Sequence, residues 1–208
     1  MSGGVVGRDP ERTRRRILDA ALKEFSARGF AGARVSGIAS RAKINKRMLY
    51  HYFGNKEKLF HEMLQDKLTS RVRRFHTYSA DLIEGLPLLF EQNHQDADWV
   101  RLLGWESLQT NGGRVLDEAD RRRRAQATNA LIRRQQAEGK IMAEIKPKHF
   151  HLVMSSLAIF PVAFQQLTRL ITGKSASDPI FQRDYARFLK QIAVVFRPNR
   201  GRAKKSAK

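Results

Sequence analysis

The sequence predicts an all-α fold, in which a small N-terminal helical domain precedes a larger C-terminal helical bundle. Apolar residues recur at intervals of three and four along most of the 208 residues, which is the spacing of an amphipathic helix. No segment alternates apolar and polar residues for long enough to predict a β-strand. Glycine, proline and asparagine interrupt the apolar pattern repeatedly, and these interruptions separate the predicted helices.

The first predicted helix begins at Asp9 and Pro10 and ends at Gly29. Aspartate is a favoured N-cap, and proline is tolerated at the first helical position because its missing N–H would have no helical partner there. Glycine commonly follows a helix because it adopts the left-handed backbone that many C-termini need. The apolar face of this helix consists of Ile17, Leu18, Ala21, Leu22 and Phe25.

Two short helices and one longer helix follow. The second carries Val35, Ile38, Ala39 and Ala42, and the third carries Met48, Leu49 and Phe53. Gly54 then breaks the chain, and Asn55 is well placed to cap a fourth helix that extends to about residue 78.

Five further helices are predicted over residues 81–93, 97–109, 113–138, 147–172 and 179–196. Pro161 lies inside the apolar run at 147–172, and we expect it to kink that helix rather than end it. The last segment, 197–208, has no apolar periodicity, and we expect a basic flexible tail there.

The composition limits the class of protein. A hydrophobic content of 41% is enough for a packed core. The absence of cysteine excludes disulfides and thiolate metal sites and fits a reducing compartment. No apolar run reaches the length of a membrane span, and Met1–Asp9 lacks the apolar core of a signal peptide. We therefore expect a cytoplasmic protein with no membrane partner.

The net charge of +20 is concentrated at the two ends of the chain. Residues 1–78 carry 18 basic and 7 acidic side chains, and 197–208 carry six basic side chains and no acidic one. Such a field attracts polyanions, because basic groups that neutralise phosphates release condensed counterions. The alternative is that the charge serves solubility alone.

The segment from Val35 to Phe53 has the pattern of a helix-turn-helix. Ala39 is small where two helices would cross, and Ile38, Ile44 and Leu49 can fill the space between them. Asn45 can cap the second helix of the pair. The polar side chains that then point outward near its N-terminal end are Lys46, Arg47, Tyr50 and His51. In DNA-reading units this end of the helix enters the major groove.

Residues 13–64 resemble the DNA-binding domain of the TetR (tetracycline-repressor) family. The resemblance is carried by Ile17-Leu18-Asp19-Ala20-Ala21, Phe25, Gly29-Phe30, Ile38-Ala39, Leu49-Tyr50-His51-Tyr52-Phe53, Asn55-Lys56-Glu57 and Leu59-Phe60. It implies a homodimer of all-helical subunits, double-stranded operator DNA read by the paired third helices, and a C-terminal ligand pocket. The implied domains are 9–55 for DNA binding, 56–196 for ligand binding and dimerisation, and the tail 197–208.

The resemblance also implies a set of DNA-binding residues. They are Arg34, Ser36, Asn45, Lys46, Arg47, Met48, Tyr50, His51 and Lys56. Two positions depart from the family pattern. Lys43 occupies a turn position where the family often has glycine, and Arg34 replaces the serine or threonine that usually begins the second helix.

The ligand pocket is predicted from apolar residues at helical spacing in the C-terminal region, for which simple core packing is the alternative. The candidates are Phe90, Trp99, Leu102, Trp105, Glu106, Met154, Phe160 and Phe164. Tryptophan and methionine suit an adaptable apolar pocket between helices. His149 and His151 are two residues apart and face different sides of a helix, so we expect no metal site there.

These observations and the resemblance together predict a ligand-responsive repressor, with an activator as a less favoured alternative. The predicted protein needs no cofactor, is not an enzyme and responds to a small-molecule effector whose identity the sequence does not give. The dimer is expected to form through residues 147–172 and 179–196, whose apolar side chains exceed what one monomer needs to bury. A ligand-independent architectural or partner-docking DNA-binding protein is the alternative. A helical enzyme is a more distant one, because no phosphate-binding loop, metal motif or nucleophile motif is present.

Overall fold

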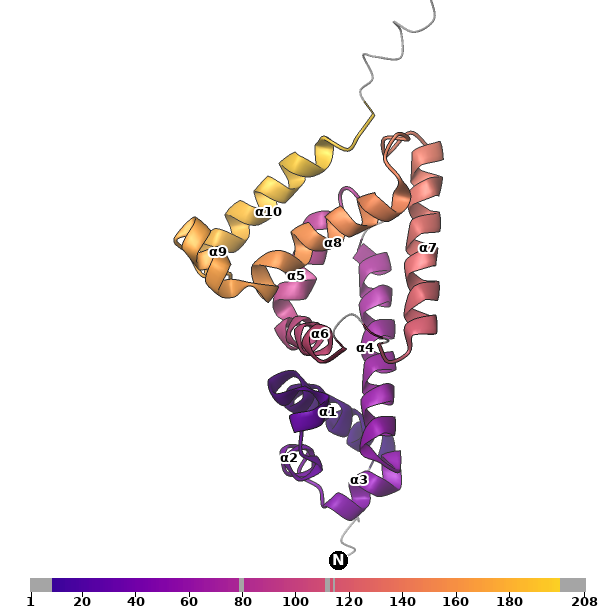
Figure 1. Ribbon diagram of the computed structural model, residues 1–208, viewed down its shortest axis with the longest axis vertical. Coiled ribbons are helices and arrows are strands. Elements are labelled where there is room, and N and C mark those ends of the chain that lie inside the picture. The colour runs from indigo at the N-terminus through magenta and orange to yellow at the C-terminus, as the bar shows by residue number, and fades with distance from the viewer. Residues whose placement is uncertain (1–8, 79–80, 111–112, 114, 199–208) are drawn as a thin grey trace, which may run out of the picture. The chain divides into compact units, whose positions relative to one another are not determined.

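The structure is a computed structural model that describes residues 9–78, 81–110, 113 and 115–198. In these residues it is all-helical, as predicted, with helices α1 to α10 and no strand (Figure 1). The first five are α1 Pro10–Gly32, α2 Val35–Arg41, α3 Lys46–Phe53, α4 Lys56–Tyr78 and α5 Leu86–Gln95. The others are α6 Ala97–Thr110, α7 Glu118–Ala137, α8 Pro147–Ala163, α9 Gln165–Thr172 and α10 Pro179–Val194.

The chain divides into two compact units. The first comprises Met1–Arg71 and Arg101–Leu116, and the second comprises Val72–Val100 and Asp117–Lys208. The predicted boundary between residues 55 and 56 does not coincide with this division, because residues 56–71 of α4 and 101–110 of α6 belong to the first unit. The α4 side chains Leu59, Phe60, Met63 and Leu64 are buried there.

The core of the first unit is formed by the predicted apolar faces. The predicted face of α1 is buried, and so are Ile38 of α2 and Leu49 and Phe53 of α3. The ring of Phe25 meets the ring of Phe60 edge to face, with centroids 4.7 Å apart. Burial of this many apolar side chains is the main stabilising contribution available to a small helical domain.

The helix ends in the first unit also follow the sequence. Asp9 caps α1, accepting from the backbone N–H of Glu11 at 3.0 Å, and Asn55 caps α4 through a 2.8 Å bond from the N–H of Lys58. Gly29 interrupts α1 with φ 66° and ψ 174°, and a single further turn continues to Gly32. The predicted end of the helix is Gly29, where its regular geometry is interrupted, but α1 ends at Gly32.

In the second unit, α5 packs against α8 and α10, and α7 packs against α8. Phe90 of α5 is buried, and its ring centroid lies 4.9 Å from that of Tyr185. Two buried amides join the elements. The Oε1 atom of Gln135 accepts from the N–H of Leu82 at 3.1 Å, and the Nδ2 atom of Asn93 donates to the carbonyl of Ala158 at 3.1 Å.

The predicted single helix over 147–172 is wrong, because the chain breaks at Phe164 and α9 turns away from α8 by 89°. Pro161 does not end α8, although it has no N–H to donate to the carbonyl of Leu157. The hydroxyl of Tyr185 donates to that carbonyl instead, at 2.9 Å. After the break, the hydroxyl of Thr168 donates to the carbonyl of Pro161 at 3.3 Å.

Two other predicted helices begin later than expected. Residues 81–85 form a turn in which Asp81 accepts from the N–H of Ile83 at 2.8 Å, so α5 begins at Leu86. Asp117 has a left-handed backbone with φ 58°, and α7 therefore begins at Glu118 rather than at residue 113.

The predicted tail begins at Arg197, but this residue is part of the folded unit. Its guanidinium donates to Glu84 Oε1 at 2.6 Å and to Asp81 Oδ2 at 3.3 Å. The bond to Glu84 and the charge of Asp81 raise the pKa of Arg197. The remainder of the predicted tail, 199–208, lies outside the described residues.

Replacing Gly29 by alanine is expected to destabilise the protein by about 1–3 kcal/mol, because its backbone conformation is essentially restricted to glycine. A Cβ atom at Gly29 would also lie 3.2 Å from the ring of Trp105. Urea unfolding of Gly29→Ala and Gly32→Ala measures the difference. A Cβ at Gly32 meets its nearest neighbour, Arg28 Cβ, at an ordinary 3.5 Å, so this control should unfold like the wild type. Equal midpoints for the two variants would contradict the expectation.

Candidate nucleic-acid interface

The turn between α2 and α3 is held by backbone bonds in a left-handed conformation. Lys43 has φ 52°, the conformation that a glycine would adopt at lower cost. The N–H of Lys43 donates to the carbonyl of Ser40 at 3.0 Å, and that of Ile44 donates to the carbonyl of Ala39 at 3.0 Å. The guanidinium of Arg16 in α1 donates to the carbonyl of Ala42. The turn is therefore anchored to both preceding helices.

Helix α3 begins directly after this turn, with Asn45 as its N-cap. The Oδ1 atom of Asn45 accepts from the N–H of Met48 at 2.8 Å, as the sequence predicts. Leu49 and Phe53 are 0% and 2% exposed and attach α3 to the core. These two residues lie four apart on one face of the helix, so the other faces are left for polar side chains.

The structure places the predicted DNA-binding residues around this helix. Those with exposed side chains are Arg34, Ser36, Asn45, Lys46, Arg47, Tyr50 and His51, whereas Met48 and Lys56 are half-buried. Tyr50 is 45% exposed, and Tyr52, not predicted as a contact, is half-buried with its ring centroid 6.2 Å from that of Phe53. The first turn of α3 thus presents Lys46 and Arg47 together.

Sequence reasoning missed the role of Glu24, a carboxylate buried in α1. Arg34 precedes α2 without a side-chain cap. Glu24 Oε1 accepts from the backbone N–H of Arg34 at 3.2 Å and pairs with Arg28 Nε at 3.2 Å. A carboxylate near the start of a helix is favourable because the unpaired N–H groups there carry partial positive charge. A Cβ at Gly37 would lie 3.0 Å from this carboxylate, so glycine in α2 allows its close approach.

The side chain of Lys56, which the resemblance implies as a DNA contact, is held by contacts within its own subunit. Its ammonium donates to the carbonyl of Ala31 at 3.3 Å and lies 4.9 Å from the centre of the Phe30 ring. These contacts hold the ammonium beside the end of α1, close to the start of α4. Lys58, in the first turn of α4, has an exposed side chain.

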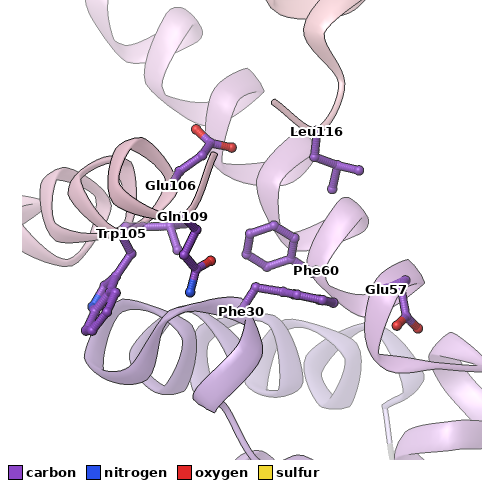
Figure 2. Close-up of a pocket in the computed structure, with 8 residues that line it drawn as sticks. Phe30, Glu57, Phe60, Trp105, Glu106, Gln109 and Leu116 are labelled. Atoms are coloured by element: carbon purple, nitrogen blue, oxygen red, sulfur yellow. The ribbon is translucent and has the colours of Figure 1, made fainter. Parts of the chain in front are cut away.

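The predicted ligand-pocket residues do not share one environment. Leu102, Trp105 and Glu106 line a cavity in the first unit (Figure 2). The other five belong to the second unit, where Phe90, Trp99 and Met154 are buried. Phe160 and Phe164 are not enclosed in a pocket, because they are 39% and 55% exposed and contact each other with centroids 5.2 Å apart. Phe164 lies at the break between α8 and α9, which the sequence did not predict.

The described residues contain neither a metal-binding cluster nor a single helix that could span a membrane. The part of the chain that the structure describes contains no group of three or more histidine, cysteine, aspartate or glutamate side chains placed to hold a metal ion. No single described helix has the length and apolarity needed to cross a membrane, and the bent pair α8 and α9 meets the test by length and composition only.

Comparison with known sequences identifies both parts of the chain. Residues 17–63 match the family "Bacterial regulatory proteins, tetR family", and residues 87–187 match the family "Tetracyclin repressor-like, C-terminal domain". HTH-type transcriptional repressor SCO4008 of Streptomyces coelicolor is 30% identical over 169 residues, which cover 81% of this chain and 88% of that protein. HTH-type transcriptional repressor NicS of Pseudomonas putida is 28% identical, covering 92% and 95%.

Solved structures agree on the fold. Transcriptional regulator SCO4942 of Streptomyces coelicolor has a TM-score of 0.74 and 25% identity, covering 89% of this chain and 98% of its own. Salmonella enterica GusR has a TM-score of 0.66 at 18% identity, covering 91% and 97%. The extent of these matches and the all-helical architecture lead to one assignment. The chain belongs to the TetR family and is a ligand-responsive DNA-binding transcriptional regulator.

Proposed function

We propose that this regulator is a repressor that binds operator DNA as a homodimer and is released by a small molecule. The exposed, capped first turn of α3 is the observation that carries the DNA-binding part of the proposal. The repressor assignment is supported by the two relatives described above, which are both named repressors. A cytoplasmic location follows from the same proposal, because operator DNA is there.

In this proposal, the two α3 helices of the dimer enter successive major grooves on one face of the DNA, about 34–36 Å apart. Arg47 reads a guanine edge, since its planar guanidinium can donate two parallel hydrogen bonds to that base. Lys46, Tyr50 and His51 contact phosphate or neighbouring bases. Arg34 and Ser36, at the start of α2, contact the backbone of the DNA.

The dimer interface is assigned to α8, α9 and α10 because these helices carry many exposed apolar side chains. The largest of them are Leu152, Val153, Phe160, Phe164, Leu167, Leu170, Ile171, Ile180, Phe188, Val194 and Val195. Large apolar patches on the surface of a protein commonly mark the place where a partner binds. Covering it with the same surface of a second copy would remove it from water in a closed, symmetric assembly.

Release from the operator follows from differential binding. An effector can favour a dimer in which the two α3 helices have a different spacing. Operator affinity then falls by the factor by which the effector prefers that dimer. Helix α4 begins in the DNA-binding unit and ends in the second unit. This continuity makes α4 the element through which we propose that the spacing changes.

Truncation of Arg47 to alanine tests the base-reading role. Removal of a bidentate contact should weaken the free energy of binding to the cognate base pair by about 1–3 kcal/mol. The preference for that base at that position of the operator should also be relaxed. Selection from random DNA with the wild type and Arg47→Ala compares the two half-site motifs. If affinity falls while the motif is unchanged at every position, Arg47 anchors phosphate and reads no base.

Lys56→Ala should weaken binding to all DNA sequences alike, because a phosphate contact carries no sequence information. The slope of the logarithm of the binding constant against the logarithm of the salt concentration is negative. Its magnitude should fall by about 1 for each phosphate that the variant no longer neutralises, counted over both subunits. Binding titrations between low and moderate salt provide the slope. Lys140→Ala is the matched control, because it removes the same charge from an exposed loop residue paired with Glu138. A sequence-selective weakening in Lys56→Ala, or an equal slope change in both variants, would contradict the phosphate role.

The double variant Phe188→Gln and Val195→Gln should be monomeric at concentrations where the wild type is a dimer, because it places polar groups on the proposed interface. Phe188 and Val195 are 44% and 64% exposed, so neither substitution disturbs the core of the subunit. Sedimentation velocity measures the outcome. Leu108→Gln alters a more exposed apolar residue, in α6, and should stay dimeric. An unchanged dimer in the double variant would place the interface elsewhere.

A further inference from the structure

Two arginine side chains of α1 contact the chain at the two ends of α3, the helix to which DNA reading is assigned above. The guanidinium of Arg16 donates to the carbonyl of Ala42, which lies just before the turn that leads into α3. The guanidinium carbon of Arg14 lies 5.6 Å from the centre of the ring of Phe53, the last residue of α3. Residues two apart on a helix point to different sides, so the two arginines leave α1 in different directions.

Arg14 also joins α3 to the helix that follows it. Its Nη2 atom pairs with Oε2 of Glu62 in α4. A cation within about 6 Å of a ring centroid is attracted to the face of the ring, and a planar guanidinium can donate to a carboxylate at the same time. One side chain of α1 therefore contacts α3 and α4 together.

The buried attachments of α3 to the core are apolar. Leu49 and Phe53 are buried on one face of the helix, and burial of apolar surface does not by itself fix a direction. Hydrogen bonds and charge-assisted pairs depend on distance and angle. A binding site needs its side chains held within about 0.5 Å and 10–20° of their productive geometry. Arg14 and Arg16 supply directional restraints at the two ends of the helix.

Arg15, the residue between these two arginines, binds different partners. Its guanidinium pairs with Asp66 of α4 at 3.0 Å and with Asp19 of α1 at 3.3 Å. Arg15 therefore matches Arg14 in its helix, its charge and its ion pair with α4, but these partners lie on α1 and α4 rather than on α3. The comparison separates an ion pair that joins α1 to α4 from one that also contacts α3.

We propose that Arg14 and Arg16 are positioning residues for α3 and thereby set how strongly the protein prefers its operator over other DNA. Both belong to the basic N-terminal region that attracts phosphate, but their guanidinium groups are directed to protein acceptors. The inference rests on the proposed role of α3 in reading DNA, and it adds two residues that act on operator preference without touching a base.

DNA-binding measurements on the full chain with Arg14→Ala, Arg15→Ala and Arg16→Ala test the proposal. The probes are the sequence that the wild type selects from random DNA and a scrambled duplex of the same length and composition. Each variant loses one positive charge, and alanine keeps α1 helical. The ratio of the two affinities should fall about fivefold or more in Arg14→Ala and Arg16→Ala and stay unchanged in Arg15→Ala. Affinity for the scrambled duplex should be equal in all three variants.

Glu62→Gln and Asp66→Asn form a second matched pair. Each variant removes the charge of the carboxylate that pairs with one arginine and keeps the shape of the side chain. Glu62→Gln should lower the operator preference in the same direction as Arg14→Ala, by a smaller factor because the contact with the ring of α3 remains. Asp66→Asn should leave the preference unchanged. Circular dichroism and thermal unfolding establish that each variant is folded at the temperature of the binding measurements.

An operator preference in Arg14→Ala and Arg16→Ala equal to that of Arg15→Ala would overturn the proposal, because the two arginines would then contribute to stability alone. Weaker binding to both duplexes than in Arg15→Ala, with a smaller salt dependence, would also overturn it by identifying phosphate contacts. Failure of the proposed function has a different signature, since a wild type that selects no motif would contradict the operator reading on which this inference rests.

Discussion

The turn between α2 and α3 is the constraint on which the proposed DNA-reading surface depends. Helix α3 has only eight residues and is attached to the core by two buried side chains, so its direction is determined largely by the segment that precedes it. Lys43 adopts a left-handed backbone there, at a cost of about 1–2 kcal/mol for a residue other than glycine. Backbone bonds to α2 and the bond from Arg16 to the carbonyl of Ala42 offset that cost.

A second substitution in the same domain is compensated in a similar way. Arg34 lacks the short hydroxyl that would cap α2, and the buried carboxylate of Glu24 binds the backbone N–H of Arg34 from α1 instead. The side chain of Arg34 is exposed and therefore available for the phosphate contact that we propose. A group from a neighbouring helix thus replaces a local cap, and position 34 carries a basic side chain in place of a capping hydroxyl.

In the second unit, the break between α8 and α9 changes the surface that we propose for a partner. The carbonyl of Leu157 left free by Pro161 is bonded by Tyr185 of α10, which allows α8 to continue for two residues before the chain turns. Phe164 then ends α8, and the amphipathic helix α9 carries Leu167, Leu170 and Ile171 with their side chains exposed. The break therefore enlarges the apolar surface assigned to the dimer.

The sequence by itself determined the all-α class, the faces of α1 to α4, the caps Asp9, Asn45 and Asn55, and the family, because caps and periodicity act over one or two helical turns. Only the tertiary structure decided the roles of Glu24 and Arg16, the break at Phe164 and the cavity beside Trp105. The contacts made by Glu24, Arg16 and Trp105 join different helices: Trp105 meets the carbonyl of Ser26, 79 residues earlier. Spacing along one helix carries no information about such partners, and the predicted pocket therefore mixed residues of two units.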